Sequence, residues 1–191
     1  MTPRILAICG SARRDSMNRR LLALAIAHAR SLGAEVSDLR IAPTLLPIYD
    51  GDLEAAEGLP QGARDLKEAF AAHDGFLIAS PEYNGFFTPL LKNAIDWVSR
   101  PAPGVGSPFA GKAAALLAAS AGSLGGIRGL PHLRLLLSNL GVTVAAGQMA
   151  LAGADTAFDQ EGRLTKPMHR SMLESTVSGL LALSAALKGR A

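Results

Sequence analysis

Five short apolar runs alternate with helical patterns along this chain of 191 residues, and this alternation limits the possible folds more than any other feature. Strands separated by helices form a parallel sheet that is covered on both faces. We therefore expect an α/β fold: a three-layer sandwich around a five-stranded parallel sheet, as a single domain over residues 1–191. The expected strands are Arg4–Cys9, Glu35–Leu39, Gly75–Ala79, Lys112–Ala119 and Val142–Ala146, and the expected helices are Arg19–Leu32, Ala63–His73, Leu90–Val98, Leu130–Leu140 and Lys166–Leu187.

The secondary structure of some segments cannot be predicted from the periodicity of apolar residues alone. Lys112–Ala119 is rich in alanine, so intrinsic propensity favours a helix, but its place in the alternation favours a strand. Glu35–Leu39 alternates apolar and polar residues, which is typical of a half-exposed edge strand. Ile41–Pro60 holds three prolines and two glycines, and Pro81–Thr88 is rich in turn formers. We expect the first to be a long irregular connection and the second a loop.

The order of the strands follows from the handedness of their connections. Right-handed crossovers leave few topologies for five parallel strands, and the order 2-1-3-4-5 is one that fits. Ligands of such sheets bind beyond the carboxyl ends of the strands, near the point between strands 1 and 3 where the order reverses. The loops at residues 10–18, 80–89 and 120–129 should therefore carry the functional residues.

Composition excludes several classes of protein. Hydrophobic residues make up 49% of the chain and charged residues 18%, which excludes intrinsic disorder. The single cysteine, Cys9, excludes a disulfide framework and fits a reducing cytoplasm. The net charge is only +3, and lysine and arginine are spread along the chain. We expect no nucleic-acid partner, no membrane span and no signal peptide, and the mildly basic charge favours an anionic small molecule as the ligand.

The loop after the first expected strand has the chemistry of an anion site. Gly10 permits a tight turn, and the helix that follows presents free N–H groups and a partial positive charge. Ser11, Ser16 and Asn18 add short polar donors, and Arg13 can make a charge-assisted contact with a phosphate. The loop matches neither GxGxxG nor GxxxxGK[ST], which disfavours a Rossmann dinucleotide site and an NTPase. The alternative is that Ser16 only caps the helix and the arginines are solvated.

The loop after the third strand combines turn formers with an aromatic residue. Asn84-Gly85 can adopt positive φ, which would point main-chain N–H groups outward. A planar heterocycle needs an apolar face and hydrogen-bonding groups along its edge. Tyr83 could offer the face and the N–H groups of residues 82–85 the edge. The alternative is a plain turn in which Tyr83, Phe86 and Phe87 pack, and packing is the preferred interpretation for the two phenylalanines.

The loop after the fourth strand, residues 120–129, contains four glycines in ten residues. That many glycines would leave room for a flat ligand to approach the main chain. A flexible connection is the alternative. Its place beside the other two loops favours a role in binding.

Together the three loops resemble the NADPH-dependent FMN reductase family of flavodoxin-like proteins, which includes quinone, chromate and azo-dye reductases. The resemblance extends to about residue 145. The matching segments are GSARRDSMN at 10–18, SPEYNG at 80–85, TPLLKNAIDW at 88–97 and SAGSLGG at 120–126.

The resemblance implies a non-covalently bound FMN that relays hydride from NADPH or NADH to a small-molecule electron acceptor such as a quinone. It also implies a homodimer or homotetramer in which Arg100 reaches across the interface. The implied cofactor-binding residues fall into a phosphate group, an isoalloxazine group and a group on its far side: Ser11, Arg13, Ser16, Met17 and Asn18; Pro81, Glu82, Tyr83, Asn84 and Gly85; Ser120, Gly122, Gly125 and Gly126.

No catalytic side chain or metal ligand is needed for such a reaction, because the flavin carries the chemistry. The four histidines are scattered, and we interpret them and Cys9 as structural. A flavodoxin-type electron carrier that takes no pyridine nucleotide is the main alternative, and a flavin-free anion-binding regulator is a weaker one. The arginine pairs 13–14 and 19–20 suit anionic NADPH better than a carrier's acidic docking surface.

Overall fold

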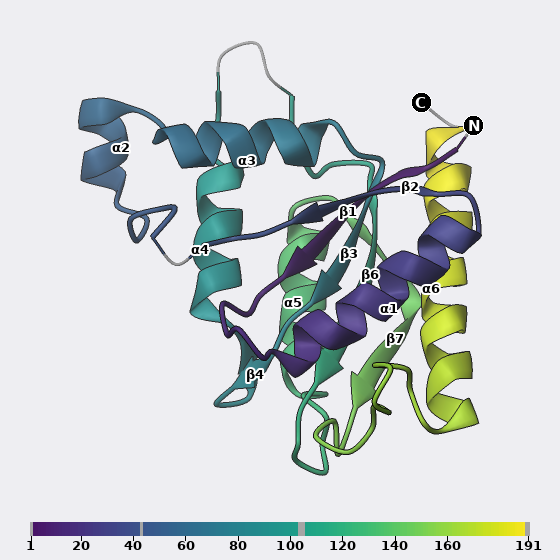
Figure 1. The fold of residues 1–191 in the computed structure, drawn as a ribbon. Coiled ribbons are helices and arrows are strands. Elements are labelled where there is room, and N and C mark those ends of the chain that lie inside the picture. Colours follow the sequence, from purple (N-terminus) through teal and green to yellow (C-terminus); the bar gives the residue numbers. More distant parts are fainter. Residues whose placement is uncertain (1, 43, 103–105, 190–191) are drawn as a thin grey trace.

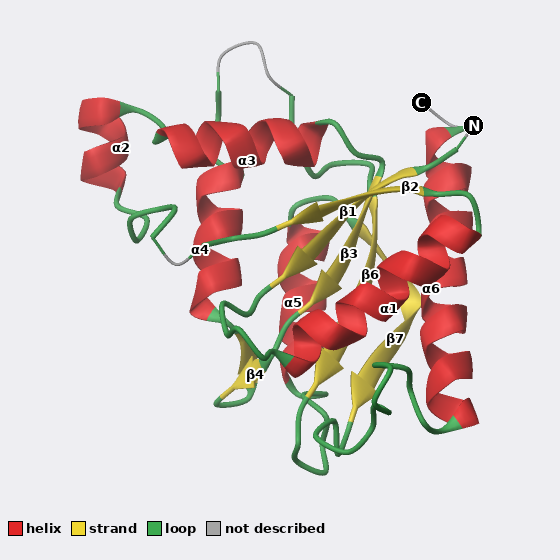
Figure 2. Ribbon diagram, viewed as in Figure 1, coloured by secondary structure: helices red, strands yellow, loops and turns green. Residues whose placement is uncertain are grey.

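The structure is a computed structural model that describes residues 2–42, 44–102 and 106–189. A five-stranded parallel sheet lies at its centre, in the order β2-β1-β3-β6-β7. The long helices cover both faces of this sheet (Figures 1 and 2). The predicted α/β sandwich and the strand order 2-1-3-4-5 are confirmed, since β6 and β7 are the fourth and fifth strands of this sheet.

Helices and strands follow one another much as the sequence predicts. The strands of the main sheet are β1 Arg4–Cys9, β2 Glu35–Leu39, β3 Gly75–Ala79, β6 Ala113–Ala119 and β7 Thr143–Leu151. A separate pair consists of β4 Glu82–Tyr83 and β5 Phe86–Phe87. The helices are α1 Met17–Ser31, α2 Gly51–Glu57, α3 Gln61–Ala71, α4 Pro89–Val98, α5 Gly129–Asn139 and α6 Pro167–Lys188.

The sheet divides the apolar interior into two cores. Ile5, Ala7 and Cys9 of β1 face the core under α1 and α6, whereas Leu6 and Ile8 face the core under α3, α4 and α5. All seven residues of β6 are buried, which explains why an alanine-rich segment is a strand here. Burial on both faces outweighs a helix preference that amounts to less than ~1 kcal/mol per residue.

Strand β7 is longer than predicted. The sequence pattern ends it at Ala146, but it continues to Leu151 and pairs with β6 along most of its length. The pairing shifts between Ala114 and Leu116, and Arg134 of α5 donates to the carbonyls of Val144 and Ala145 at this irregularity. The bulge interrupts the alternation of inward and outward side chains, so the sequence pattern ends before the strand does.

The connection Ile41–Pro60 is not wholly irregular, because it contains the short helix α2. Asp50 caps this helix by accepting hydrogen bonds from the N–H groups of Asp52 and Leu53. Gly58 ends it with a φ of 73°. Asp50 is a residue type that favours the start of a helix, but the three prolines of this segment favoured an irregular connection in the sequence analysis.

Residues 81–88 are also more ordered than a loop. Strands β4 and β5 pair as an antiparallel hairpin, with Tyr83 opposite Phe86. Asn84 and Gly85 form its two-residue turn with φ values of 53° and 82°. Positive φ at both positions is the geometry that gives tight hairpins a compatible twist, and Asn-Gly favours it strongly.

Candidate functional site

Two adjoining cavities lie at the carboxyl ends of β1, β3 and β6, which Figure 1 shows at one edge of the sheet. Their volumes are about 260 and 330 Å³, and they share Glu82 and Ser120 as lining residues. All of the residues predicted to bind the cofactor line one or both cavities except Gly85 and Gly125. The three loops therefore converge at the switch point of the sheet.

The first cavity is lined by both serines of the loop after β1. Ser16 caps α1, since its Oγ accepts the N–H of Arg19 at 3.2 Å, and Ser11 Oγ accepts the N–H of Arg13 at 3.3 Å. Both serines are buried, and neither hydroxyl donates to an oxygen or nitrogen atom in the described part of the chain, although the Ser16 hydroxyl also lies beside the Cys9 thiol. A cap and an anion site are therefore compatible here, because each hydroxyl hydrogen is still available to a ligand.

The basic residues near this loop differ in their pairing. Arg19 forms an ion pair with Asp38 of β2 at 2.6 Å, and the guanidinium of Arg20 lies 4.3 Å from the centre of the Phe158 ring. Arg13 and Arg14 are exposed, and neither has an ion-pair partner within residues 2–42, 44–102 and 106–189. Of these four arginines, Arg19 is the one whose charge is paired with an acidic group in the described part of the chain.

The Asn18 side chain makes a contact within the chain that the sequence did not predict. Its side chain is buried, donates to the carbonyl of Ala119 at 2.8 Å and accepts the N–H of Ala119 at 3.0 Å. One amide hydrogen is left for a ligand. The main contribution of Asn18 is to tie the loop after β1 to the end of β6. Met17, the first residue of α1, lines the first cavity beside it.

A second tie joins the loop after β1 to the segment after β3. Thr88 caps α4 and donates its hydroxyl hydrogen to the carbonyl of Gly10 at 2.7 Å. A Cβ at Gly10 would lie 2.9 Å from Thr88 Oγ1 and 3.0 Å from Ser80 Oγ, so only glycine permits this approach. Thr88 was not predicted to matter for the site, although its position before Pro89 is a recognisable helix-start signal.

The hairpin forms part of the wall of both cavities. Pro81 and Tyr83 line the first cavity and Asn84 the second, with the Tyr83 side chain 48% exposed. The N–H groups of Asn84 and Gly85 donate to no other group among the described residues, as predicted for outward-pointing donors. Phe87 is buried, whereas Phe86 stacks on His132 with ring centres 4.4 Å apart and stays partly exposed.

The glycines of the loop after β6 do not all leave room for a ligand. A Cβ at Gly125 would lie 2.6 Å from the main-chain nitrogen of Ala152, and one at Gly126 would lie 2.8 Å from Ala118 Cβ. Both glycines have positive φ and are buried. They are needed because the loop packs tightly against its own chain. Ser120 and Gly122 are better placed to meet a ligand in the second cavity.

A third tie joins the hairpin to the glycine-rich loop. The Glu82 side chain is only 8% exposed and forms an ion pair with Arg128 at 2.5 Å. Burial acts to raise the pKa of the Glu82 carboxyl, but the hydrogen bonds from Arg128 outweigh it and lower that pKa below its ordinary value. Sequence reasoning missed Arg128, because nothing in the pattern connects residues 46 positions apart.

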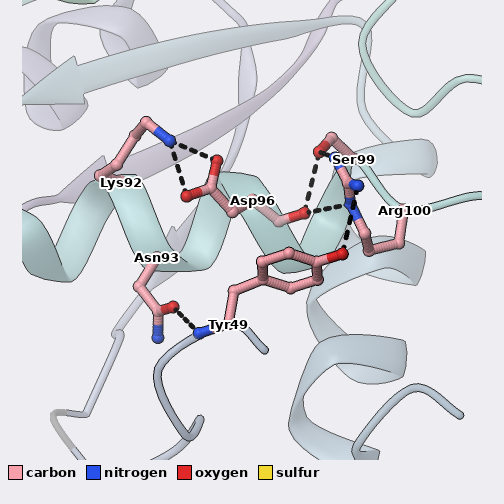
Figure 3. Close-up of polar contacts among 6 residues, drawn as sticks. All are labelled: Tyr49, Lys92, Asn93, Asp96, Ser99 and Arg100. Carbon is pink, nitrogen blue, oxygen red and sulfur yellow. Dashed lines mark hydrogen bonds and ion pairs between the residues drawn. The ribbon is translucent and has the colours of Figure 1, made fainter. Parts of the chain in front are cut away.

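Arg100, for which the resemblance implies a reach across a subunit interface, contacts groups of its own chain. Its guanidinium lies 4.9 Å from the centre of the Tyr49 ring and donates to the carbonyl of Asp96 and to Ser99 Oγ (Figure 3). These contacts within the chain hold the side chain over α4. A reach across an interface would require it to leave them.

The KNAIDW segment anchors the connection that precedes α2. Asn93 accepts the N–H of Tyr49 at 2.8 Å, as Figure 3 shows, and both Asn93 and Trp97 donate to the carbonyl of Pro47. Lys92 and Asp96 pair with each other along α4 at 2.6 Å. The resemblance in this segment thus rests on residues that build the scaffold beside the site.

Two larger cavities, of about 480 and 470 Å³, lie elsewhere. The first lies between α2, α3 and residues 101–102, and the second between α1, α6 and residues 159–164. Size alone does not locate the site, since neither of these cavities lies at the carboxyl ends of β1, β3 and β6, where the three predicted loops meet. Cys9 is fully buried, and this burial raises the pKa of its thiol. Among the described residues, no helix is long and apolar enough to cross a membrane.

Comparison with known proteins identifies the family of this chain. Residues 3–156 match the model of a family described as NADPH-dependent FMN reductase. An NAD(P)H-dependent FMN reductase of Pseudomonas aeruginosa is 36% identical over 97% of both chains. An NAD(P)H:quinone oxidoreductase of Solanum tuberosum is 36% identical over 98% of this chain and 95% of its own.

A solved structure is similar as well. FerB, a flavoenzyme NAD(P)H:(acceptor) oxidoreductase from Paracoccus denitrificans, superposes with a TM-score of 0.84 at 26% identity, covering 97% of this chain and 98% of its own. The family's dependence on NADPH distinguishes it from the flavodoxin-type carriers, which take no pyridine nucleotide. The chain therefore belongs to the NADPH-dependent FMN reductase family and is an NAD(P)H-dependent oxidoreductase that uses FMN.

Proposed function

We propose that the protein holds FMN across the two adjoining cavities and uses it to pass hydride from NAD(P)H to quinones. The phosphate would lie in the first cavity, at the loop after β1, and the isoalloxazine would lie between the hairpin and the glycine-rich loop. One observation carries this placement above the others. The loop after β1 carries hydrogen-bond donors that remain available to an anion. It lines the first of two adjoining cavities, and both cavities are also lined by a hairpin whose turn N–H groups have no acceptor among the described residues.

The donor set fits the charge of a phosphate ester. Ser11 and Ser16 each keep a hydroxyl hydrogen, Arg13 keeps its charge, and the first N–H groups of α1 point out of the helix. Several such donors converge on one cavity, and charge-assisted hydrogen bonds of this kind are the strongest a protein makes to a phosphate. A neutral ligand would leave Arg13 without a partner.

The residues of the second cavity fit the polar edge of a flat ring. Asn84, Ser120 and Gly122 line this cavity, and the main-chain N–H of Asn84 has no acceptor among the described residues. FMN, when bound, accepts hydride from a reduced nicotinamide and delivers it to the acceptor. The chain's own contribution would be to bind and orient the flavin: Tyr83 would offer a partly exposed apolar face, and the hairpin turn would offer main-chain hydrogen-bond donors.

Quinones are the acceptors best supported for this chain. Relatives at 36% identity are named for quinone or FMN reduction, and these alignments span almost the whole chain. Quinones are flat and uncharged, and they accept a hydride and a proton. NADPH and NADH are both retained as donors, because no group that reads a ribose phosphate is identified in the cavities.

Assembly and location are part of the same proposal. A homodimer or homotetramer would cover the exposed apolar side chains beside the site, which include Tyr83, Phe86, Leu124 and Ile127. A reduced, buried Cys9 suits the cytoplasm. Light scattering after size exclusion tests the first point, since a monomer at micromolar concentration contradicts it. Fractionation of the source cells tests the second.

The placement of FMN is tested with the apoprotein. Titration with FMN should show that Arg13→Ala combined with Ser16→Ala weakens binding by at least about tenfold, because a charged and a neutral phosphate donor are both lost. Asp38→Asn is the matched control, since it removes a neighbouring charge that is not part of the cavity. Unchanged FMN affinity in the double variant would show that the phosphate binds elsewhere.

Hydride transfer is tested with the wild-type holoprotein under anaerobic conditions. Addition of NADPH or NADH should bleach the flavin absorption without a partner protein, and a quinone should restore it. Flavin that stays oxidised with both nucleotides would support the electron-carrier alternative instead.

A further inference from the structure

Helix α5 begins without a cap of its own. Arg128 occupies its N-cap position with a helical backbone conformation and makes no side-chain cap hydrogen bond. The first turn of α5 contains no acidic residue. The N-terminus of a helix presents main-chain N–H groups that need acceptors, and a partial positive charge that favours an anion. Some other part of the chain must meet this need.

Glu82 of the hairpin supplies the missing acceptor. Its Oε2 accepts the main-chain N–H of Arg128 at 3.0 Å, and its Oε1 accepts the Nε hydrogen of Arg128 at 2.6 Å. The hairpin also packs directly on the start of the helix, because a Cβ at Gly129 would lie 3.2 Å from the carbonyl of Phe86. One carboxylate from β4 therefore caps α5 and holds the side chain of the capped residue.

The contact lies where the two walls of the second cavity meet. Glu82 and Asn84 contribute to this cavity from the hairpin side, whereas Gly126 and Arg128 contribute from the side of the glycine-rich loop. The other two ties, Asn18 to Ala119 and Thr88 to Gly10, join each wall to the loop after β1. The Glu82–Arg128 ion pair joins the hairpin to the glycine-rich loop directly, and Phe86 of the hairpin also stacks on His132 of α5.

We propose that Glu82 is a positioning residue that acts through Arg128 and α5 to set the separation of the hairpin from the glycine-rich loop, and so preforms the space for the flavin ring. This inference rests on the proposed placement of FMN. A site whose walls are already held apart at the correct distance binds without the entropic cost of ordering them. Loss of the carboxylate leaves both walls folded but lets them move relative to each other.

The experiment compares FMN binding by apoprotein variants, measured by the quenching of flavin fluorescence. We expect Glu82→Ala and Arg128→Ala each to raise the Kd for FMN about tenfold, because both disconnect the same walls. The double variant should bind no more weakly than the single ones, since the second change removes nothing further. Glu82→Gln, which keeps an acceptor for the Arg128 N–H, should fall between them and wild type.

A matched control exists in the same chain. Asp159 accepts the main-chain N–H of Arg163 at 2.8 Å and its Nε hydrogen at 2.9 Å, which is the same arrangement outside both site cavities. Asp159→Ala should leave the Kd for FMN unchanged. Stopped-flow mixing adds a second readout, the association rate constant of FMN. If the two walls must become ordered before FMN binds, this rate constant should be lower in Glu82→Gln than in wild type. A mere loss of stability would lower the thermal midpoint and leave the association rate constant unchanged.

The possible outcomes distinguish the positioning role of Glu82 from the proposed placement of FMN. The positioning role is wrong if Glu82→Gln and Glu82→Ala both bind FMN within about twofold of wild type while Arg13→Ala with Ser16→Ala binds weakly. Equal weakening by Asp159→Ala also contradicts it. If the Arg13 and Ser16 variant binds normally, the placement of FMN is wrong instead. Should Glu82→Ala not fold, Glu82→Gln and Arg128→Ala decide the question.

Discussion

Polar groups at the two ends of the sheet differ in whether they have hydrogen-bond partners within the chain. At the amino end, Asp74 accepts hydrogen bonds from the N–H of Arg4 and from Lys188 Nζ, both at 2.8 Å, and Lys112 Nζ donates to the last carbonyls of α3. At the carboxyl end, Arg13 and the turn of the hairpin keep donors without a partner among the described residues. Polar groups at the amino end close the structure, whereas part of those at the carboxyl end are left for a ligand.

The carboxyl end is nevertheless firmly built. Asn18, Thr88 and Glu82 each join two loops that are far apart in the sequence, and the donors left over are carried on these braced loops. Groups that bind and groups that brace are therefore different residues in the same loops. Variants that change stability without changing FMN affinity, or the reverse, test this division.

The largest effect should come from Gly125. A side chain there would have an unfavourable positive φ and would meet the main chain of Ala152, so Gly125→Ala should lower the free energy of unfolding by about 3 kcal/mol. Urea unfolding measures this. Gly122→Ala is the control, since its Cβ would make only an ordinary contact at 3.5 Å. Equal losses in both variants would show that the glycine-rich loop does not pack as described.

Asn18 comes next. Asn18→Leu fills a similar volume but leaves the N–H and carbonyl of Ala119 without partners in a buried place, which should cost about 2–3 kcal/mol of unfolding free energy. Asn139→Leu, at an exposed position near the end of α5, should change stability by less than about 0.5 kcal/mol. A small effect at Asn18 would mean that the brace between β6 and the loop after β1 is unimportant.

Asp74 tests the amino end through pH. Burial acts to raise the pKa of its carboxyl, but hydrogen bonds from Lys188 and Arg4 outweigh it and hold that pKa below its unfolded value of about 3.8. The ionised carboxyl therefore stabilises the fold above this value, and the contribution disappears as the pH falls through the native pKa. Asp74→Asn should cost about 1 kcal/mol at pH 7 and progressively less in acid. A difference that does not change with pH would contradict the proposed pairing.

Arg13 should show the smallest effect on stability. Its side chain is exposed and pairs with no acidic group of the described chain, so Arg13→Ala should change the free energy of unfolding of the apoprotein by less than about 0.5 kcal/mol. Flavin titration of the same variant should still show weaker binding. A clear loss of apoprotein stability would mean that Arg13 braces its loop, and the division between binding and bracing groups would fail there.

The candidate site could be predicted in outline because its ingredients are local. A glycine after an apolar strand, two serines before a helix and an Asn-Gly turn are legible within ten residues each. The chain order of strands and helices then places the three loops at one edge. The full length of β7 was not predicted because a bulge interrupts its strand periodicity. Helix α2 was not predicted because the prolines around it are typical of an irregular connection.

Sequence alone determined the alternation of strands and helices, and hence the parallel sheet and the edge at which its loops meet. Which polar groups of those loops already have hydrogen-bond partners depends on the tertiary structure. Asn18 and Ala119 are 101 residues apart, and Glu82 and Arg128 are 46 apart, so no local pattern reveals that they are partners. A hydrogen bond depends on distance and direction in space, and those are set by how the elements pack rather than by their order along the chain.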